Sequence, residues 1–146
     1  MQLHNVLDIR YNKELSELKI CMVYLGDISK NSCKFRHPSG FTMIKKEIKE
    51  WMRELSAALR LVTYSEGIVW QAPIKVEIEC YQSGRGRPLD CGNLCDIISD
   101  SVRDGVSVDD RFFEVLTVPS KRAAEAKIVI TVTNGGCRDP KASAVG

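Results

Sequence analysis

The chain has 146 residues, of which 44% are hydrophobic and 27% are charged. This composition is typical of one soluble globular domain with a single core, and it argues against a disordered, fibrous or membrane-spanning chain. The formal net charge of +2 allows binding to a polyanion but does not require it. Because the N-terminal region shows no secretory leader, we expect a cytoplasmic protein that has no membrane partner.

Six cysteines are scattered through apolar patterns of the sequence. A chain with this much hydrophobic sequence does not need a disulfide framework. Zinc would require tighter cysteine pairs with histidines nearby, whereas Cys91 and Cys95 are one helical turn apart and His4 and His37 are the only histidines. We therefore expect the cysteines to be buried small apolar residues.

The N-terminal half predicts one strand, one basic loop and one helix. Residues 1–18 carry a mixed pattern that allows either a short strand or a loose arm. The apolar run at 20–28 predicts a buried strand, and the Ser-, Asn-, Pro- and Gly-containing stretch 29–40 predicts a basic loop. Apolar residues then recur at helical spacing from Thr42 to Val62, which predicts a helix.

The C-terminal half predicts three strands and a short amphipathic helix. The helical pattern runs from Leu94 to Val102 and ends at Gly105. Strands are predicted at 74–81, 112–118 and 128–133, with a basic connection at 120–127. We expect residues 1–136 to form one domain and the Gly-, Pro-, Ala- and Ser-rich residues 137–146 to be a disordered tail.

Acidic residues bracket the predicted central helix. Asp90 stands at its entrance, Asp96 and Asp100 within it, and Asp109 and Asp110 after it. Neighbouring carboxylates repel unless something neutralises them, and Mg²⁺ prefers such oxygen ligands together with water and phosphate. A purely structural interpretation remains open: Asp90 would cap the helix, Asp96 and Asp100 would lie on its solvated face, and Asp109 with Asp110 would form a turn. On spacing alone, the structural interpretation is favoured.

The sequence IECYQSGRGRPLDCGNLCDIISDSVRDGVSVDDRFFEV, residues 78–115, resembles the core of the RusA-type Holliday-junction resolvases. Their hallmark is a strand, a basic turn, Asp-x-Asp-Asn-Leu-x-Lys on a helix, and an Asp-Asp pair about one helix later. Asp90, Asn93 and Leu94 match the first half of this pattern, and Asp109 with Asp110 matches the pair; Asp100 matches a recurrent acid of the helix.

Two positions depart from the pattern. Gly92 stands where the family has its second aspartate, and Asp96 stands where it has a lysine. Losing a carboxylate weakens metal binding, and losing one donor that stabilises transition-state charge costs roughly 3 kcal/mol. Asp96 could partly replace the missing carboxylate. Four cations could replace the lysine's charge: Arg85, Arg87, Lys121 and Arg122.

The resemblance implies a small α+β domain, with a mixed β-sheet and two main helices packed against it, that forms a homodimer. It implies a metal-dependent, structure-selective endodeoxyribonuclease that resolves four-way junctions in DNA recombination and repair by hydrolysing phosphodiesters. A closed two-fold dimer suits the two-fold symmetry of a junction.

The resemblance also implies roles for individual residues. Asp90 and Asp110 would bind Mg²⁺, or Mn²⁺ as a substitute, with Asp109 or Asp96 assisting, and a metal-activated water would attack the phosphate. Glu79 is a weaker candidate ligand that alternation also allows at the surface. Contacts to DNA phosphates are expected from six cations: Arg85, Arg87, Lys121, Arg122, Lys34 and Arg36.

Two other functions remain open. Because of Gly92 and Asp96, the chain could be a catalytically impaired relative that binds branched DNA without cutting it. Alternatively, it could be a protein that binds no nucleic acid, in which the acids are structural and the thiols matter. Metal-dependent cutting would support the nuclease, and salt-sensitive binding without cutting would support the impaired relative. Neither cutting nor binding would leave the protein that binds no nucleic acid.

Overall fold

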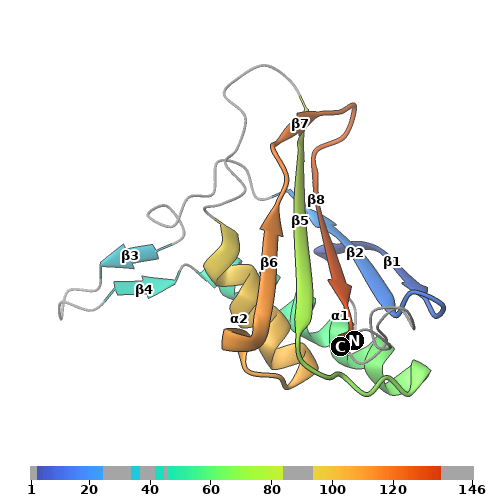
Figure 1. The fold of residues 1–146 in the computed structure, drawn as a ribbon. Helices are drawn as coiled ribbons and strands as arrows, with labels where there is room; N and C mark the ends of the chain where they lie inside the picture. Colours follow the sequence, from blue (N-terminus) through green and yellow to red (C-terminus); the bar gives the residue numbers. More distant parts are fainter. Residues whose placement is uncertain (1–2, 25–33, 37–41, 45, 84–93, 136–146) are drawn as a thin grey trace.

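The structure, a computed structural model, describes residues 3–24, 34–36, 42–44, 46–83 and 94–135 (Figure 1). It is a single small α+β domain in which two helices pack against one face of a six-stranded mixed sheet, as predicted from the sequence. The helices are α1 (Lys46–Glu66) and α2 (Cys95–Val106). The strands of the sheet are β1 (Val6–Asn12), β2 (Glu17–Val23), β5 (Ile74–Gln82), β6 (Phe113–Thr117), β7 (Lys121–Arg122) and β8 (Lys127–Thr133).

The strand order of the sheet is β1-β2-β8-β5-β6. Neighbours from β1 to β5 are antiparallel, whereas β6 runs parallel to β5. The two-residue β7 also pairs parallel with β5, farther along that strand. The chain crosses from β5 to β6 through α2, as parallel pairing requires, and this crossover places α2 against the sheet.

Period-two alternation decides which face of the sheet the helices cover. On the helix side, the three central strands present only buried apolar residues: Leu18, Ile20, Met22, Ile74, Val76, Ile78, Cys80, Ile128, Ile130 and Val132. Their neighbours in sequence point to the opposite, open face and include charged residues such as Lys19, Lys75 and Glu79. In β8, Val129 and Thr131 on this other face are buried as well. The core therefore lies between the sheet and the two helices.

The two helices pack closely against each other through small residues. A Cβ atom placed on Gly105 would lie only 2.6 Å from the Cβ of Leu59, so α1 approaches α2 at a point where no larger residue fits. The Ser56 hydroxyl donates to the Ser101 carbonyl at 2.7 Å across the same contact. This packing fixes the position of α2 relative to α1.

Two predictions for the N-terminal half are wrong in part. Lys34–Arg36 forms strand β3 rather than loop, because it pairs antiparallel with β4 (Thr42–Ile44) in a separate two-stranded sheet. The same pairing removes residues 42–44 from the predicted helix, and α1 begins at Lys46 and continues to Glu66. Residues 1–18, for which two structures were allowed, contain β1 and the start of β2.

The other predicted helix and strands are confirmed with shifted ends, but the connection predicted at 120–127 contains the two-residue strand β7. The strand predicted from Ile20 begins at Glu17, and residues 25–28 lie outside the described residues. Helix α2 includes Gly105 and ends at Val106, because Ser107 adopts the left-handed conformation (φ 59°) that ends the helix. The predicted disordered tail at 137–146 also lies outside the described part. No described helix is long and apolar enough to cross a membrane.

Candidate functional site

The candidate site lies on the outer face of α2. The helical repeat turns Ile97, Ile98 and Val102 into the core, which leaves the acidic positions on the side away from the sheet. Asp96 and Asp104 are exposed and Asp100 is half-buried. The apolar spacing of α2 thus explains why its carboxylates share one outer surface.

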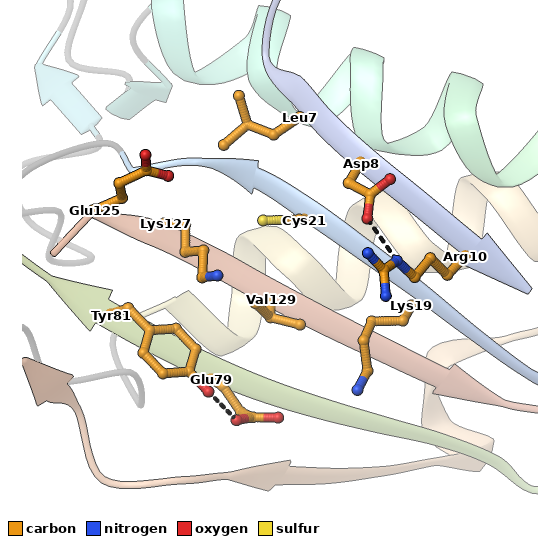
Figure 2. A pocket seen from close by; sticks show the side chains of 10 residues that line it. All are labelled: Leu7, Asp8, Arg10, Lys19, Cys21, Glu79, Tyr81, Glu125, Lys127 and Val129. Carbon is orange, nitrogen blue, oxygen red and sulfur yellow. Dashed lines mark hydrogen bonds and ion pairs between the residues drawn. The ribbon is translucent and has the colours of Figure 1, made fainter. Parts of the chain in front are cut away.

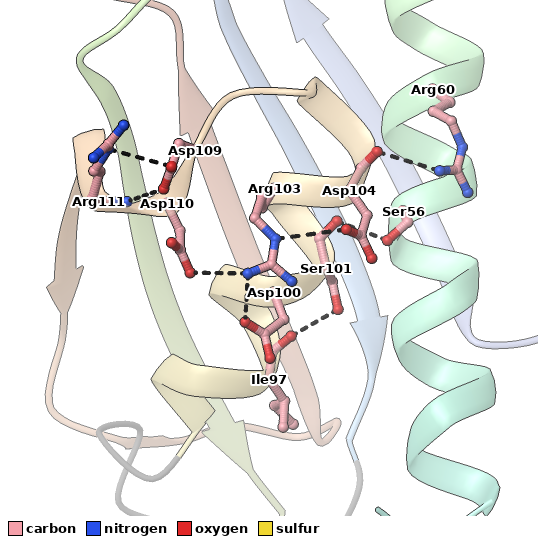
Figure 3. A network of polar contacts seen from close by, with 10 residues as sticks. All are labelled: Ser56, Arg60, Ile97, Asp100, Ser101, Arg103, Asp104, Asp109, Asp110 and Arg111. Carbon is pink, nitrogen blue, oxygen red and sulfur yellow. Dashed lines mark hydrogen bonds and ion pairs between the residues drawn. The ribbon is translucent and has the colours of Figure 1, made fainter.

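Arg103 connects three of the carboxylates (Figure 3). Its Nη1 atom lies 3.4 Å from Asp100 Oδ1 and 3.4 Å from Asp110 Oδ2, and its Nε atom lies 3.7 Å from Asp104 Oδ1. Because the Asp100 and Asp110 oxygens share one nitrogen neighbour, they are no farther apart than twice 3.4 Å. We call these residues, Asp100, Arg103, Asp104 and Asp110, the Arg103 cluster.

Asp109 and Asp110 begin the short turn that leads from α2 into β6. Asp109 caps the 3₁₀ helix η2 (Asp110–Phe112), since its carboxylate accepts a hydrogen bond from the Arg111 backbone N–H at 3.1 Å. This bond lowers the pKa of the Asp109 carboxyl. Asp109 thus has a structural role in the turn, while Asp110 points toward α2 and Arg103.

The pKa of the Asp100 carboxyl is raised. Its partial burial is the main cause, and the neighbouring carboxylates of Asp110, Asp96 and Asp104 raise it further against the opposing charge of Arg103. The carboxylates therefore interact electrostatically as a group, which was the reason for expecting a neutralising cation. In this structure the neutralising group is a guanidinium.

The described acids suit a hard cation in donor type, because Mg²⁺ is commonly held by carboxylate oxygens and water. Within the residues that the structure describes, no three acidic, cysteine or histidine side chains come together closely enough to hold a metal ion. Asp90, the first predicted ligand, lies outside these residues, as do Gly92 and Asn93. The described part thus supplies Asp110, with Asp100 beside it, to any such site.

Two of the predicted DNA-contacting cations, Lys121 and Arg122, lie far from the Arg103 cluster. Lys121 pairs with Tyr81 of β5, whereas Phe113, which follows η2, pairs with Ile74. At about 3.3 Å per residue, Lys121 lies roughly 23 Å along the sheet from the start of β6. Arg122 follows Lys121 in β7, so both are at the far end of the sheet from Asp110 (Figure 1).

Of the other four predicted cations, two can be placed and two cannot. Lys34 and Arg36 are the end residues of β3, in the small hairpin separate from the main sheet. Arg85 and Arg87 lie outside the described residues. Their proximity to the Arg103 cluster therefore stays a prediction.

Glu79 lies on the opposite side of the sheet from α2. Figure 2 shows it on the open face, where its carboxylate accepts a 2.7 Å hydrogen bond from the Tyr81 hydroxyl. This bond is the main cause of the raised pKa of Tyr81. The residue lines a shallow depression of about 460 Å³ together with Lys19, Lys127 and others. Glu79 therefore does not lie beside Asp110. It is at the surface of the open face, which the alternation of β5 had allowed.

The three cysteines that the structure describes form no disulfide with one another: Cys80 and Cys95 belong to or border the core, whereas Cys21 lines the depression on the open face. Cys80 is buried, and Cys21 and Cys95 are partly buried. Burial raises the pKa of the Cys21 thiol, which disfavours the reactive thiolate. The expected role as a buried small apolar residue is confirmed for Cys80, and Cys95 packs partly buried against the core, whereas Cys21 departs from the prediction.

Sequence reasoning overlooked Arg103, the residue at the centre of the cluster. The signal was present, because Arg103 follows Asp100 by three residues on a helix and so lies on the same face. Asp104 was also overlooked, although it follows Asp100 by four residues and so lies on the same face of the helix. What spacing could not give is the direction of Asp110, which depends on the turn at η2.

No model of a known protein family matches the chain, and a search of curated proteins found no match either. The resemblance of residues 78–115 to the RusA-type resolvases therefore stays a prediction from the sequence motif.

Proposed function

We propose that this protein is a metal-dependent endodeoxyribonuclease of the RusA type that selects branched DNA and resolves four-way junctions in recombination and repair. The observation that carries the proposal is the Arg103 cluster, in which Asp110 of the Asp-Asp pair and Asp100 of the central helix face one another on an exposed surface. Carboxylates grouped in this way are unfavourable without a cation, and phosphodiester hydrolysis is a common use of such groups.

Each residue has a proposed task. Asp110 and Asp90 would hold Mg²⁺ or Mn²⁺, with Asp109 or Asp96 assisting, and Asp100 would keep Asp110 aligned through Arg103. A cation held by these carboxylates would supply a water of lowered pKa and would polarise the scissile phosphate. Arg103 is the proposed replacement for the lysine that Asp96 displaces, because its guanidinium, once shared less with the carboxylates, can hold a phosphate oxygen.

The proposal includes a homodimer and a cytoplasmic location. Two equivalent sites related by a two-fold axis would cut two strands of like polarity in a four-way junction. Arg85, Arg87, Lys34, Arg36, Lys121 and Arg122 remain proposed contacts to the arms, and the distance of Lys121 from Asp110 assigns it to DNA away from the cut.

A second candidate function is binding of branched DNA without cleavage. The pairing of Asp100 and Asp110 with Arg103 favours it, because an arginine that already neutralises these carboxylates competes with a metal ion. Gly92 also favours this second function, because it stands in place of a carboxylate that would help to bind the metal.

Cleavage of a labelled synthetic four-way junction tests the proposal. We expect symmetric nicks with Mg²⁺ or Mn²⁺, none with chelator, and none on a linear duplex of matched sequence. Asp110→Asn should abolish nicking but retain binding of the junction, or strengthen it, because a negative charge near phosphate is removed.

The contrary outcomes are distinct. Tight junction binding with no nicking in either metal would establish the second candidate function. An Asp110→Asn protein that nicks as fast as wild type would show that the cluster is not the site of hydrolysis. Circular dichroism of the variant serves as the control for folding.

A further inference from the structure

Helix α1 carries a row of cations along one side. Lys46, Lys49, Arg53 and Arg60 are all exposed. At about 100° per residue, these four positions fall within an arc of about 60° on the helix surface. The acidic residues Glu47, Glu50 and Glu54 fall on the adjacent arc, which has a similar width, so each charge has its own side of the helix and one pair, Arg53 with Glu50, is in contact across the boundary.

The cationic side of α1 faces α2. A groove of about 240 Å³ lies between the helices and is lined by Lys49, Met52, Arg53, Ser56, Arg60, Ser101 and Asp104. Figure 3 shows Arg60 reaching from α1 toward α2, where it donates to the Asp104 carbonyl at 3.3 Å. On the acidic side, the buried Glu54 accepts hydrogen bonds from the backbone and side chain of Asn5.

The two α2 carboxylates of the Arg103 cluster do not account for this row of cations. Asp104 and Asp100 are both paired with Arg103, which is on their own helix. Arg53 pairs with Glu50 one turn away, at 3.3 Å with both side chains more than half exposed, and such a pair is worth about 0–1 kcal/mol. The cations are thus only weakly engaged and can exchange partners at small cost.

We propose that Lys49, Arg53 and the groove beside them bind the phosphate backbone of a DNA arm that leaves the Arg103 cluster. Lys49 and Arg53 are about 6 Å apart along the helix axis, and the row from Lys49 to Arg60 extends about 16 Å. One strand of DNA carries a phosphate every 3.4 Å of its axis, so the row spans about five phosphates. The surface reads charge and not sequence.

The position of the groove gives it a role in the proposed reaction. Asp104 borders the groove and also belongs to the Arg103 cluster, so the cationic row and the acidic site form one continuous surface across α1, α2 and η2. DNA held by the cations is thereby kept beside carboxylates that would otherwise repel it. This inference rests on the proposed function for the choice of DNA as ligand.

Salt dependence of binding tests the proposal. The probe is a fluorescent four-way junction, titrated in chelator so that it stays uncut, over a range of potassium chloride concentrations. Lys49→Gln with Arg53→Gln should lower the slope of log affinity against log salt by about 1.8, or about 0.9 for each phosphate contact. Affinity at about 0.1 M salt should fall by roughly ten- to a hundredfold. Arg60 is left unchanged because it also joins the helices.

The matched control is Lys19→Gln with Lys75→Gln, which removes the same charge from the open face of the sheet. We expect this variant to keep the wild-type slope. Equal loss of slope in both variants, or an unchanged slope in the α1 variant, would overturn the proposal. If the wild-type protein nicks junctions but the α1 variant keeps the wild-type salt slope, the α1 surface does not bind DNA although the proposed nuclease function holds. If the α1 variant has a lower salt slope but the wild-type protein does not nick, the α1 surface binds DNA although the proposed nuclease function fails.

Discussion

Arg103 neutralises the carboxylates that surround it in the Arg103 cluster. One guanidinium contacts Asp100, Asp104 and Asp110, each at 3.4–3.7 Å. All four side chains are at least one-third exposed, so water screens these pairs and their net contribution to stability is small. Arg103 is therefore easily displaced from any one carboxylate.

The first prediction concerns the replacement of Arg103 by glutamine. Without metal, Arg103→Gln should lower the free energy of unfolding by at most about 1 kcal/mol, because exposed ion pairs contribute little each. With millimolar Mg²⁺, the variant should gain more thermal stability than wild type, since freed carboxylates bind the cation without competition. Thermal melts with Mg²⁺ and with chelator measure both effects. An equal Mg²⁺ effect in both proteins would mean that Arg103 does not compete with metal.

The second prediction uses the raised pKa of Asp100. Because the carboxyl has a pKa above its ordinary 3.8 in the folded chain, ionising it costs more in the folded than in the unfolded state. Its charged form therefore opposes folding, and this penalty appears as the pH rises through 3.8 and beyond. Asp100→Asn removes the penalty, so the variant should gain stability relative to wild type on going from below pH 3.8 to pH 7.

Denaturant unfolding at several pH values in chelator measures this difference. Asp109→Asn is the opposite control, because the folded-state pKa of Asp109 is lowered and its charge favours folding. A stability difference between wild type and Asp100→Asn that does not change with pH would contradict the assigned electrostatics.

At the scale of the helices, the site depends on how closely α1 approaches α2. Gly105 permits this approach, because an added Cβ would meet Leu59 Cβ at 2.6 Å, Leu59 Cδ1 at 2.8 Å and the Ser56 carbonyl at 3.2 Å. The groove lies between α1 and α2, and the Arg103 cluster, on α2 and η2, borders it through Asp104. A change at Gly105 therefore tests the packing that positions them.

The third prediction is that Gly105→Ala destabilises the protein. Overpacking of a tight contact costs about 1–3 kcal/mol, and the helix propensity of alanine offsets about 1 kcal/mol of this cost. These two terms leave a net loss of about 0–2 kcal/mol. Because the added Cβ would lie only 2.6 Å from the Leu59 Cβ, we expect a loss near the upper end of this range in urea unfolding. Ser99→Ala, elsewhere on α2, is the control and should not destabilise. A variant at Gly105 as stable as wild type would show that the helices can separate without cost.

Much of this element structure could be predicted from hydrophobic period alone. The alternation in β5 and the helical repeat in α1 and α2 correctly gave the core-facing residues. The reason is that a buried face must be apolar, so apolar residues recur with the period of the strand or helix. The start of α1 could not be predicted, since Thr42–Ile44 continues the helical apolar pattern and only its pairing with β3 makes it a strand. Likewise, no local pattern predicts that η2 turns Asp110 toward Arg103.

At the scale of the whole molecule, the sheet divides the surface into two faces of different character. One face bears the helices, the Arg103 cluster and the cationic row of α1. The open face mixes both charges, with Glu79 beside Tyr81 and Lys127 over the Tyr81 ring at 5.3 Å. The proposed chemistry therefore belongs to the helical face, and the described part of one chain presents one such cluster. Paired cutting of a junction then requires two chains.

The last prediction tests this requirement with mixed dimers. The substrate is a circular plasmid with an extruded cruciform, which becomes linear if both strands are cut in one encounter and an open circle if only one is cut. Wild type should give mostly linear product. Refolding wild type with an excess of Asp110→Asn places most wild-type subunits beside an inactive partner, so open circles should replace linear product while total nicking per wild-type subunit stays similar. An unchanged ratio of linear to open-circle product would mean that single chains, or larger assemblies, perform the cutting.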